Sequence, residues 1–361
     1  MEKKRLGDIC EIVTGATPKT NIKEFWDGDI NWITPAELTE DTYIINESLR
    51  KITTEGVEKT GLKSFPKGPV ILSSRAPIGK VAIAGCEMYC NQGFKNLVCS
   101  KQINNRFLYW YLKGHKEYLN SLGRGATFKE ISKAIVENIE ICLPTLEKQE
   151  KYADILEQCN GIIQIKKGQL RKLDTLVKSR FAEMFGDPIR NPKGWKVVTI
   201  GDIVTEVRYG TSKPAVEGGK YPYLRMNNLT ADGHLDLNDL KYIDISDDEV
   251  EKCVVRKGDV LFNRTNSIDL VGKTAVFDLQ DDMVIAGYII RVRLNEKILP
   301  EVLSQYMNLE ALKDILRSMA KGAVNQANIN AQELQSIRVY VPDIELQKQF
   351  VEMKDQVDKS K

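Results

Sequence analysis

One segment occurs twice in the chain, as FPKGPVILSSRAPIGKVAIA (residues 65–84) and as VRKGDVLFNRTNSIDLVGKTAVF (residues 255–277). In both versions a Lys-Gly pair precedes an apolar run, and a polar loop follows that carries Arg75 or Arg264. A Gly-Lys pair then begins a second apolar run. Short apolar runs bounded by turn residues favour β-strands, so we expect a β-hairpin at each place.

The similarity extends outward from both hairpins. Upstream, LGDICEIVTGATP (6–18) corresponds to IGDIVTEVRYGTSKP (200–214), and downstream GRGATFKEIS (123–132) corresponds to KGAVNQANIN (321–330). Each repeat is far longer than the roughly 20 to 50 residues of a solenoid unit. We therefore expect two copies of a whole domain, an arrangement that suits a target composed of two half-sites.

A long helical pattern follows the first copy. Apolar residues recur at steps of four and three with one polar interruption, at Tyr152, Leu156, Cys159, Ile163, Lys166, Leu170, Leu173, Val177, Phe181 and Met184. This spacing predicts a coiled-coil seam that needs a partner helix, and Gly186 and Pro188 end the helix. The second copy begins the same helix after Asp343, but the sequence given reaches only Lys361.

These patterns divide the chain into five parts. They are a first globular domain (1–145), a long coiled-coil helix (146–186), a linker (187–198), a second globular domain (199–342) and a shortened C-terminal coiled-coil helix (343–361). Strand and helix patterns together in both globular domains predict a mixed α/β (α+β) fold class.

Composition excludes several classes of protein. The 361 residues are 42% hydrophobic and 28% charged, which is typical of a globular protein. No apolar run approaches the roughly 18 to 20 residues of a membrane-spanning helix, and the N-terminus lacks the pattern of a secretory signal. Seven scattered cysteines indicate reduced, mostly buried thiols in a cytoplasmic protein. With His115 and His234 as the only histidines, we expect no metal site.

Motifs of catalysis are incomplete. Gly272-Lys273-Thr274 resembles the end of a phosphate-binding loop, but Ser267 stands where that loop needs glycine. The tetrapeptide of an amino-methyltransferase is absent, and Pro342-Asp343 is not followed by the Glu-x-Lys of a nuclease metal site. We therefore predict that the chain is not an enzyme. Two alternatives stay open: a coiled-coil interaction scaffold, and a self-sufficient DNA-modifying enzyme with an unrecognised site.

Polar loop residues are of the types that recognise DNA, because Arg and Lys bind phosphates and guanine edges while Asn and Gln bind adenine edges. With 52 basic and 50 acidic residues, any such contact depends on local placement. In the first copy the candidate DNA-binding side chains are Lys19, Ser74, Arg75, Lys80, Gln92, Lys95, Arg124, Thr127 and Lys129. In the second copy they are Lys213, Arg225, Asn227, Arg264, Asn266, Lys273, Lys321, Asn325 and Gln326. We expect Arg75 and Arg264 at matching positions, and likewise Arg124 and Lys321.

In duplicate and in this order, the motifs resemble the specificity subunit of a type I restriction–modification system. The resemblance covers essentially the whole chain. It rests on the paired LGDI and IGDI openings, the two hairpin segments, NQGFKNL (91–97), GATFKEIS (125–132), LPTLEKQEKYADIL (143–156), GDPIRNPKGW (186–195) and VPDIELQKQF (341–350).

The resemblance implies two target recognition domains, each of which reads one half of a bipartite DNA sequence in the major groove. It also implies that the helices pack as an antiparallel coiled coil, set the spacing of the half-sites and dock two methyltransferase subunits. Those subunits would bind S-adenosylmethionine and methylate adenine, and a motor/nuclease subunit would use ATP and Mg²⁺. The chain itself would bind double-stranded DNA, hold no cofactor and act in the cytoplasm, without a membrane. The short helix after Asp343 departs from the family pattern and would leave the antiparallel pair incomplete.

Overall fold

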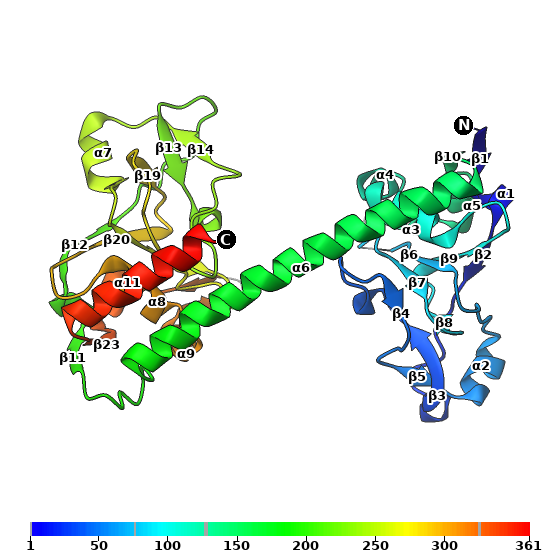
Figure 1. The fold of residues 1–361 in the computed structure, drawn as a ribbon, viewed down its shortest axis with the longest axis horizontal. Helices are drawn as coiled ribbons and strands as arrows, with labels where there is room; N and C mark the ends of the chain where they lie inside the picture. The colour runs from blue at the N-terminus through cyan, green and yellow to red at the C-terminus, as the bar shows by residue number, and fades with distance from the viewer. Residues whose placement is uncertain (1, 76, 126–128, 324–325) are drawn as a thin grey trace. The chain divides into compact units, whose positions relative to one another are not determined.

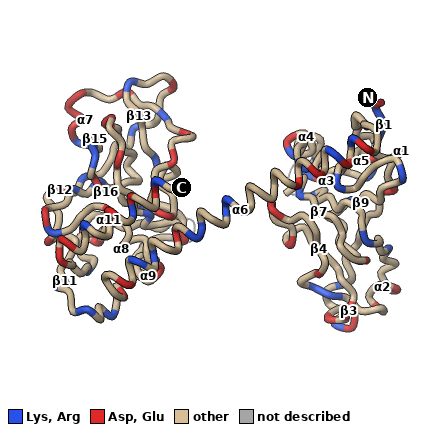
Figure 2. Tube along the Cα trace, viewed as in Figure 1, with Lys and Arg blue, Asp and Glu red and all other residues tan. Residues whose placement is uncertain are grey.

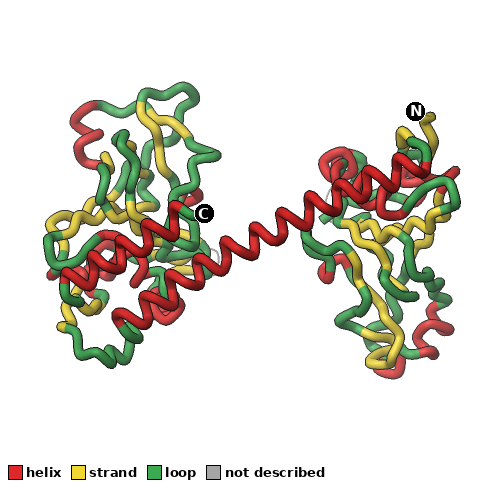
Figure 3. Tube along the Cα trace, viewed as in Figure 1, coloured by secondary structure: helices red, strands yellow, loops and turns green. Residues whose placement is uncertain are grey.

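The structure is a computed structural model that describes residues 2–75, 77–125, 129–323 and 326–361. The chain divides into two compact units, Met1–Ile165 and Lys166–Lys361 (Figure 1). Each unit holds one copy of the repeat, and each is a mixture of short helices and strands (Figure 3). The predicted α/β (α+β) class is therefore confirmed.

The described residues of the first unit form three sheets. A mixed five-stranded sheet has the order β2 (Cys10–Thr14), β9 (Phe94–Cys99), β6 (Val70–Ser73), β7 (Val81–Ala84), β4 (Ile44–Ile45). A three-stranded sheet has the order β5 (Lys51–Ile52), β3 (Trp26–Ile33), β8 (Tyr89–Cys90). A third sheet pairs β1 (Glu2–Arg5) with β10 (Glu140–Leu143).

The helices of the first unit are short, apart from the one that leaves it. They are α1 (Leu6–Ile9), α2 (Thr54–Thr60), α3 (Asn105–Gly114), α4 (Lys116–Ser121) and α5 (Lys133–Glu137), with 3₁₀ turns η1 (Lys23–Phe25) and η2 (Pro35–Glu37). Helix α3 contacts β6 and β7, and the core between the helices and the large sheet includes Leu72, Leu97 and Leu108.

The second unit repeats this plan, with four sheets among its described residues. The large sheet has the order β12 (Val204–Tyr209), β20 (Ile289–Leu294), β16 (Val260–Asn263), β18 (Thr274–Val276). The next has the order β14 (Lys241–Ile243), β13 (Tyr221–Leu224), β19 (Met283–Ile285), β15 (Val254–Val255). Two smaller sheets are β17 (Thr265–Asn266), β22 (Gln326–Asn328), β21 (Lys321–Ala323), and β11 (Lys196–Thr199) with β23 (Arg338–Val341).

The helices of the second unit follow the same sequence of elements. They are α7 (Asp247–Cys253), α8 (Pro300–Met307), α9 (Glu310–Met319), α10 (Ala331–Ser336) and α11 (Ile344–Lys359), with 3₁₀ turns η3 (Ile200–Asp202) and η4 (Met226–Asn228). Strand β11 begins within the segment 187–198 that the sequence suggested as a linker.

Both predicted hairpins are confirmed. Strands β6 and β7 are antiparallel with Val70 opposite Ile83, and β16 and β18 are antiparallel with Val260 opposite Val276. Strands β6, β7 and β16 have four residues each, and all of these are buried. Burial on both faces explains why the sequences of these strands are predominantly apolar rather than alternating.

Helix α6 (Leu146–Phe185) runs from the first unit into the second, and α11 packs against its C-terminal part (Figure 1). Phe350, early in α11, packs edge-on against Phe181 and Phe185, with ring centroids 5.3 and 5.5 Å apart. Lys361, after the end of α11, pairs with Asp174 at 2.8 Å. The two helices are therefore antiparallel. The expected seam is covered from Leu173 onward, whereas its earlier residues Tyr152, Leu156, Cys159, Ile163, Lys166 and Leu170 are exposed.

A buried glutamine fastens the first turn of each of these helices. Gln149 donates to the carbonyls of Pro144 and Gln102 at 2.9 and 3.1 Å and accepts from the amide of Asn104 at 2.8 Å. Gln347 makes the same three bonds, at 2.8, 3.0 and 2.8 Å, to the backbone of the second copy. Both side chains are fully buried, so each helix is tied to the segment that begins α3 or α8.

All seven cysteines are free thiols; Cys142 and Cys159 are exposed and the other five are buried or half-buried. In the described part of the chain, no helix is long and apolar enough to cross a membrane.

Candidate nucleic-acid interface

Four connecting segments in each unit carry most of the candidate residues and contact one another, and Figure 3 shows how much of each unit is loop. Loop A follows β2 or β12 (15–18 and 210–214), and loop B follows β3 or β13 (34–38 and 225–229). Loop C follows β6 or β16 (74–75 with 77–80, and 264–273), and loop D precedes β9 or β20 (91–93 and 286–288).

Hydrogen bonds join loop D to loops A and C in both copies. In the first copy, Thr17 of loop A donates to Gln92 of loop D at 2.5 Å, and the amide of Ser74 in loop C donates to Gly93 of loop D at 2.7 Å. In the second copy, the amide of Gly287 donates to Thr211 at 2.7 Å, and the amide of Arg264 donates to Tyr288 at 3.0 Å. The loops therefore form one cluster rather than separate surface turns.

A glycine permits the close approach of loop A to the strand before loop D. A Cβ on Gly15 would lie 2.0 Å from the carbonyl oxygen of Cys90, and a Cβ on Gly210 would lie 2.1 Å from that of Ile285. Because both neighbours are backbone atoms, no side chain can be accommodated at either position.

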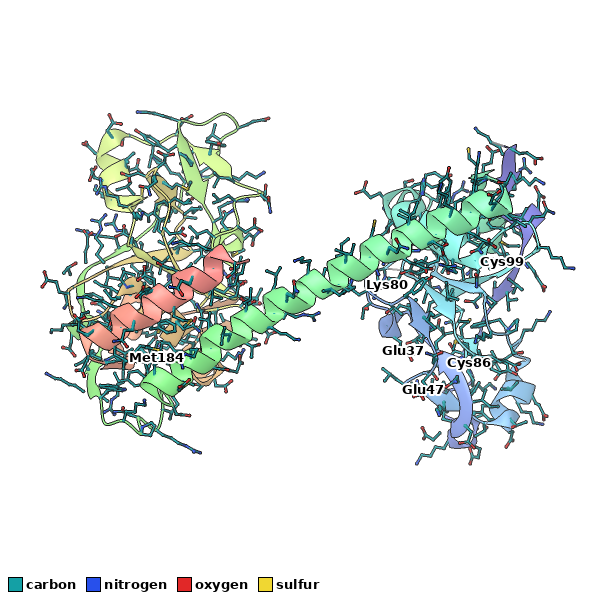
Figure 4. The ribbon with its side chains drawn as sticks, viewed as in Figure 1. Glu37, Glu47, Lys80, Cys86, Cys99 and Met184 are labelled. Atoms are coloured by element: carbon teal, nitrogen blue, oxygen red, sulfur yellow. The ribbon has the colours of Figure 1, made fainter. Side chains whose placement is uncertain are left out.

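A lysine at the end of loop C fastens loop B in both copies. Lys80 donates to the carbonyls of Pro35 and Leu38 at 3.5 and 2.5 Å (Figure 4). Lys273 donates to those of Met226, at 2.8 Å, and Leu229. Lys273 is only 8% exposed, and burial lowers its pKa. These positions argue against the predicted DNA contact of Lys80 and Lys273, because both ammonium groups are already used inside the loop cluster.

An ion-pair network joins the candidate residues of the first copy. Glu130 accepts from the Arg75 Nε at 2.8 Å and from the Lys95 Nζ at 3.4 Å, and Lys95 also donates to the Ser74 hydroxyl at 3.0 Å. Burial alone would raise the pKa of Glu130, but the hydrogen bond from Arg75 and the charge of Lys95 lower it below its ordinary value. Arg75 is exposed, whereas Ser74 and Lys95 are buried, which argues against the predicted DNA contact of these two.

Candidate residues of the second copy line a cavity of about 550 Å³ together with Tyr288 of loop D. They are Lys213, Arg225, Asn227 and Arg264. Lys213 pairs with Glu249 at 2.5 Å, and Arg225 pairs with Asp239 at 2.7 Å. The Arg264 guanidinium lies 5.0 Å from the ring centroid of Tyr209 and donates to Asn328 at 2.9 Å.

Two of the arginines that line the cavity each keep an unpaired hydrogen-bond donor. Among the described residues, the Nε atoms of Arg225 and Arg264 are shielded from solvent and have no partner. Arg225, Arg264 and the exposed Tyr288 ring therefore line a space in which an anionic or base-edge group could be held.

The expected match of Arg75 with Arg264 is wrong by one residue. The carbonyl of Arg264 accepts from the amide of Ile329 at 2.9 Å, and in the first copy the carbonyl of Ser74 accepts from Ile131 at 2.8 Å. Arg264 therefore corresponds to Ser74. The two arginines still bind side chains at one common position, Glu130 and Asn328.

Arg124 and Lys321 do match. Arg124 forms an antiparallel β-bridge with Glu130, and Lys321 forms an antiparallel β-pair with Asn328, the equivalent of Glu130. Lys321 is 81% exposed and pairs with Glu333 at 2.6 Å.

The remaining candidates divide into exposed and inward-facing residues. Lys19, Gln92, Arg124, Lys129 and Gln326 are exposed. Asn266 donates to the side chain of Asn263 at 2.8 Å and is turned inward. Thr127 and Asn325 lie outside the described residues. The predicted set omitted Tyr288, which lines the cavity. The sequence carried one signal for it: the second copy has an aromatic residue in loop D where the first copy has Gly93.

Figure 2 shows basic and acidic residues interspersed along the trace of both units. Within the described part of the chain, no group of three or more His, Cys, Asp or Glu residues is placed to hold a metal ion.

Comparison with known proteins follows the same division of the chain. The family model described as "Type I restriction modification DNA specificity domain" matches residues 1–175 and 192–361. The MjaIX type I restriction enzyme specificity subunit of Methanocaldococcus jannaschii is 37% identical over 248 residues, which cover 63% of this chain and 57% of that protein. The EcoKI specificity subunit of Escherichia coli is 25% identical over 322 residues, covering 83% of this chain and 69% of that protein.

Two solved structures share the fold. A chain of a type I R-M system matches 99% of this chain and 90% of its own length, with a TM-score of 0.54 and 20% identity. The type I restriction–modification S subunit from M. genitalium matches 99% of this chain and 89% of its own length, with a TM-score of 0.52 and 14% identity.

Proposed function

The chain belongs to the type I restriction–modification DNA specificity family, with two of its domains, and we propose that each domain reads one half of a bipartite DNA sequence. In this role the chain is the DNA-binding subunit of a larger enzyme and performs no catalysis itself. It acts on double-stranded DNA in the cytoplasm.

One observation carries the proposal: the two domains hold the same loop cluster with the same backbone contacts but present different side chains from it. Arg225 and Arg264 in the second copy stand where the first copy has Thr34 and Ser74. Tyr288 stands where the first copy has Gly93. A constant frame with variable side chains is what two readers of different half-sites require, because base choice depends on the side chains that reach base edges.

The helices give the proposed partners a place to bind. Tyr152, Leu156 and Ile163 of α6 are exposed apolar residues on one seam, which supports the docking of further subunits along this helix. We propose that these partners are two methyltransferase subunits and a motor/nuclease subunit. S-adenosylmethionine, ATP and Mg²⁺ would then be bound by the partners, and this chain would hold no cofactor.

The near-neutral charge fits such an assembly. The net charge of +2 offers few uncompensated cations for the phosphate backbone, which supplies most of the raw affinity for DNA. Partner subunits would therefore contribute phosphate contacts, while the loop clusters contribute base recognition.

The test is to express the chain with a cognate methyltransferase and to map methylated adenines by long-read sequencing. The control is the methyltransferase alone. We expect a new bipartite motif with a fixed spacer that depends on this chain. A palindromic motif would contradict the use of both domains, and an assembled complex that produces no new motif would contradict the specificity role.

A further inference from the structure

Two cysteines stand directly opposite each other at one end of the large sheet in the first unit. Cys10 is the first residue of β2 and Cys99 the last of β9, and the register pairs them (Figure 4 labels Cys99). In the neighbouring pair, the amide of Ser100 donates to the carbonyl of Ile9 at 3.0 Å. Since hydrogen-bonded and non-hydrogen-bonded pairs alternate along an antiparallel ladder, Cys10 and Cys99 form a non-hydrogen-bonded pair.

This type of pair brings side chains close together. Its Cα atoms are about 4.5 Å apart, and both side chains lie on the same face of the sheet. Disulfides form across Cα separations of about 4.4 to 6.8 Å, so the pair falls at the lower end of that range. The backbone can therefore accept a bond between these residues without a change of register.

The surroundings of the two thiols differ. Cys10 is buried in the core of the unit, whereas Cys99 is half-buried at its edge. A hydrogen bond with Cys99, reinforced by burial, raises the pKa of Cys10 well above its ordinary value. The register places the two thiols side by side, and solvent reaches the pair from the side of Cys99.

The second copy has no such pair. Val204 and Leu294 occupy the corresponding register position, in the same kind of apolar setting. The packing of the repeat therefore needs only apolar side chains here, and the paired thiols are particular to the first copy.

We propose that Cys10 and Cys99 form a reversible disulfide site whose oxidant is a low-molecular-weight disulfide such as oxidised glutathione. The Cys99 thiolate attacks one sulfur of the oxidant and expels the first glutathione thiolate, giving a mixed disulfide. Cys10 then loses its proton as its sulfur attacks that of Cys99, and the second glutathione thiolate leaves. Two thiols are oxidised, one oxidant disulfide is reduced, and the two cysteine protons end on the two released glutathione molecules.

The experiment uses the full chain treated with oxidised glutathione, blocked with N-ethylmaleimide and digested with trypsin without reduction. Trypsin separates the two cysteines into peptides 6–19 and 96–101, each with one cysteine. Mass spectrometry should find these two peptides linked as the main intramolecular disulfide, and dithiothreitol should release them. The oxidised chain should also unfold at a higher urea concentration, because the link restricts the unfolded chain.

Matched variants decide the assignment. Replacing the exposed thiols, as Cys142→Ser with Cys159→Ser, should leave the link intact. Cys10→Ser should remove it and leave Cys99 as a glutathione adduct. If Cys10→Ser does not fold, the half-buried Cys99→Ser should likewise remove the link and leave Cys10 unmodified. Accumulation of the Cys99 adduct in the wild-type chain without the linked peptides, or linkage chiefly to another cysteine, would overturn the proposal.

Discussion

A single buried glutamine fixes the start of each helix that follows a domain. The fully buried side chain of Gln347 satisfies one backbone amide and two backbone carbonyls, and Gln149 does the same in the first copy. Because such groups cost free energy when left unpaired, the glutamine specifies where the helix leaves the domain.

Gln347→Leu removes these bonds at nearly constant volume. We expect it to lower the free energy of unfolding by about 2 to 4 kcal/mol, because three backbone groups lose their partner. The neighbouring exposed Gln349→Leu is the matched control and should change stability by less than about 0.5 kcal/mol. Urea denaturation measures both. Equal effects of the two substitutions would show that the buried hydrogen bonds do not anchor α11.

Lys313 gives the second unit a distinctive response to alkaline pH. Its ammonium donates to Gly272 at 2.6 Å and Asn308 at 2.8 Å, and burial lowers its pKa from 10.5 to about 8. Between these two pH values the unfolded chain binds a proton that the folded chain has released. The contribution of Lys313 to the free energy of unfolding therefore rises with pH across this window.

Comparison of the wild-type chain with Lys313→Met isolates that contribution. Urea unfolding at several pH values between 8 and 10.5 should show a smaller upward slope for the variant. Parallel slopes for the two proteins would mean that the folded state keeps Lys313 protonated.

Individual lysines also show what sequence cannot predict. Lys80, Lys95 and Lys273 have the residue type of a DNA contact, yet carbonyls, a hydroxyl or a carboxylate inside the loop cluster satisfy them. Their acceptors come from segments distant in sequence. Whether a loop lysine faces solvent therefore depends on the tertiary fold, and residue type alone does not determine it.

At the scale of elements, α6 was predictable because its seam and its terminating Gly186 are local features of the sequence. The hairpins were predictable for the same reason. The sequence could not predict the correct alignment of Arg75 and Arg264, because loop C is longer in the second copy. That alignment is fixed only by the backbone hydrogen bonds from Ile131 and Ile329. The sequence also could not predict which part of the α6 seam is covered, because this depends on where α11 packs.

Substitutions at Phe350 of α11 and at Tyr152, its equivalent in α6, test the packing of α11 against α6. Phe350 is fully buried against Phe181 and Phe185, whereas Tyr152, its counterpart in the first copy, is 42% exposed. Phe350→Ala should lower the free energy of unfolding by about 3 to 5 kcal/mol through the cavity it leaves. Tyr152→Ala should have a far smaller effect in the isolated chain.

Chemical denaturation of the two variants supplies the comparison. A Tyr152→Ala loss as large as that of Phe350→Ala would show that the early part of the seam is also covered in solution.

At the scale of the whole molecule, the duplication explains both the fold and the proposed division of labour. Sequence similarity between the copies identified the two domains and the loops that differ. It could not identify the cavity of the second copy, because Tyr288 and Arg225 reach it from different loops. It also could not show that Arg75 and Arg264 bind equivalent positions, Glu130 and Asn328, from different places in loop C.

The central claim is that each domain reads its own half of the target. The most direct measurement is the map of methylated adenines in cells that express a cognate methyltransferase with the wild-type chain, with Arg75→Ala or with Arg264→Ala. Thermal unfolding of each variant serves as the folding control. The account predicts that Arg75→Ala relaxes or weakens only one half of the bipartite motif and Arg264→Ala only the other, with the spacer unchanged. Equal losses at both half-sites from either folded variant would contradict independent reading by the two domains.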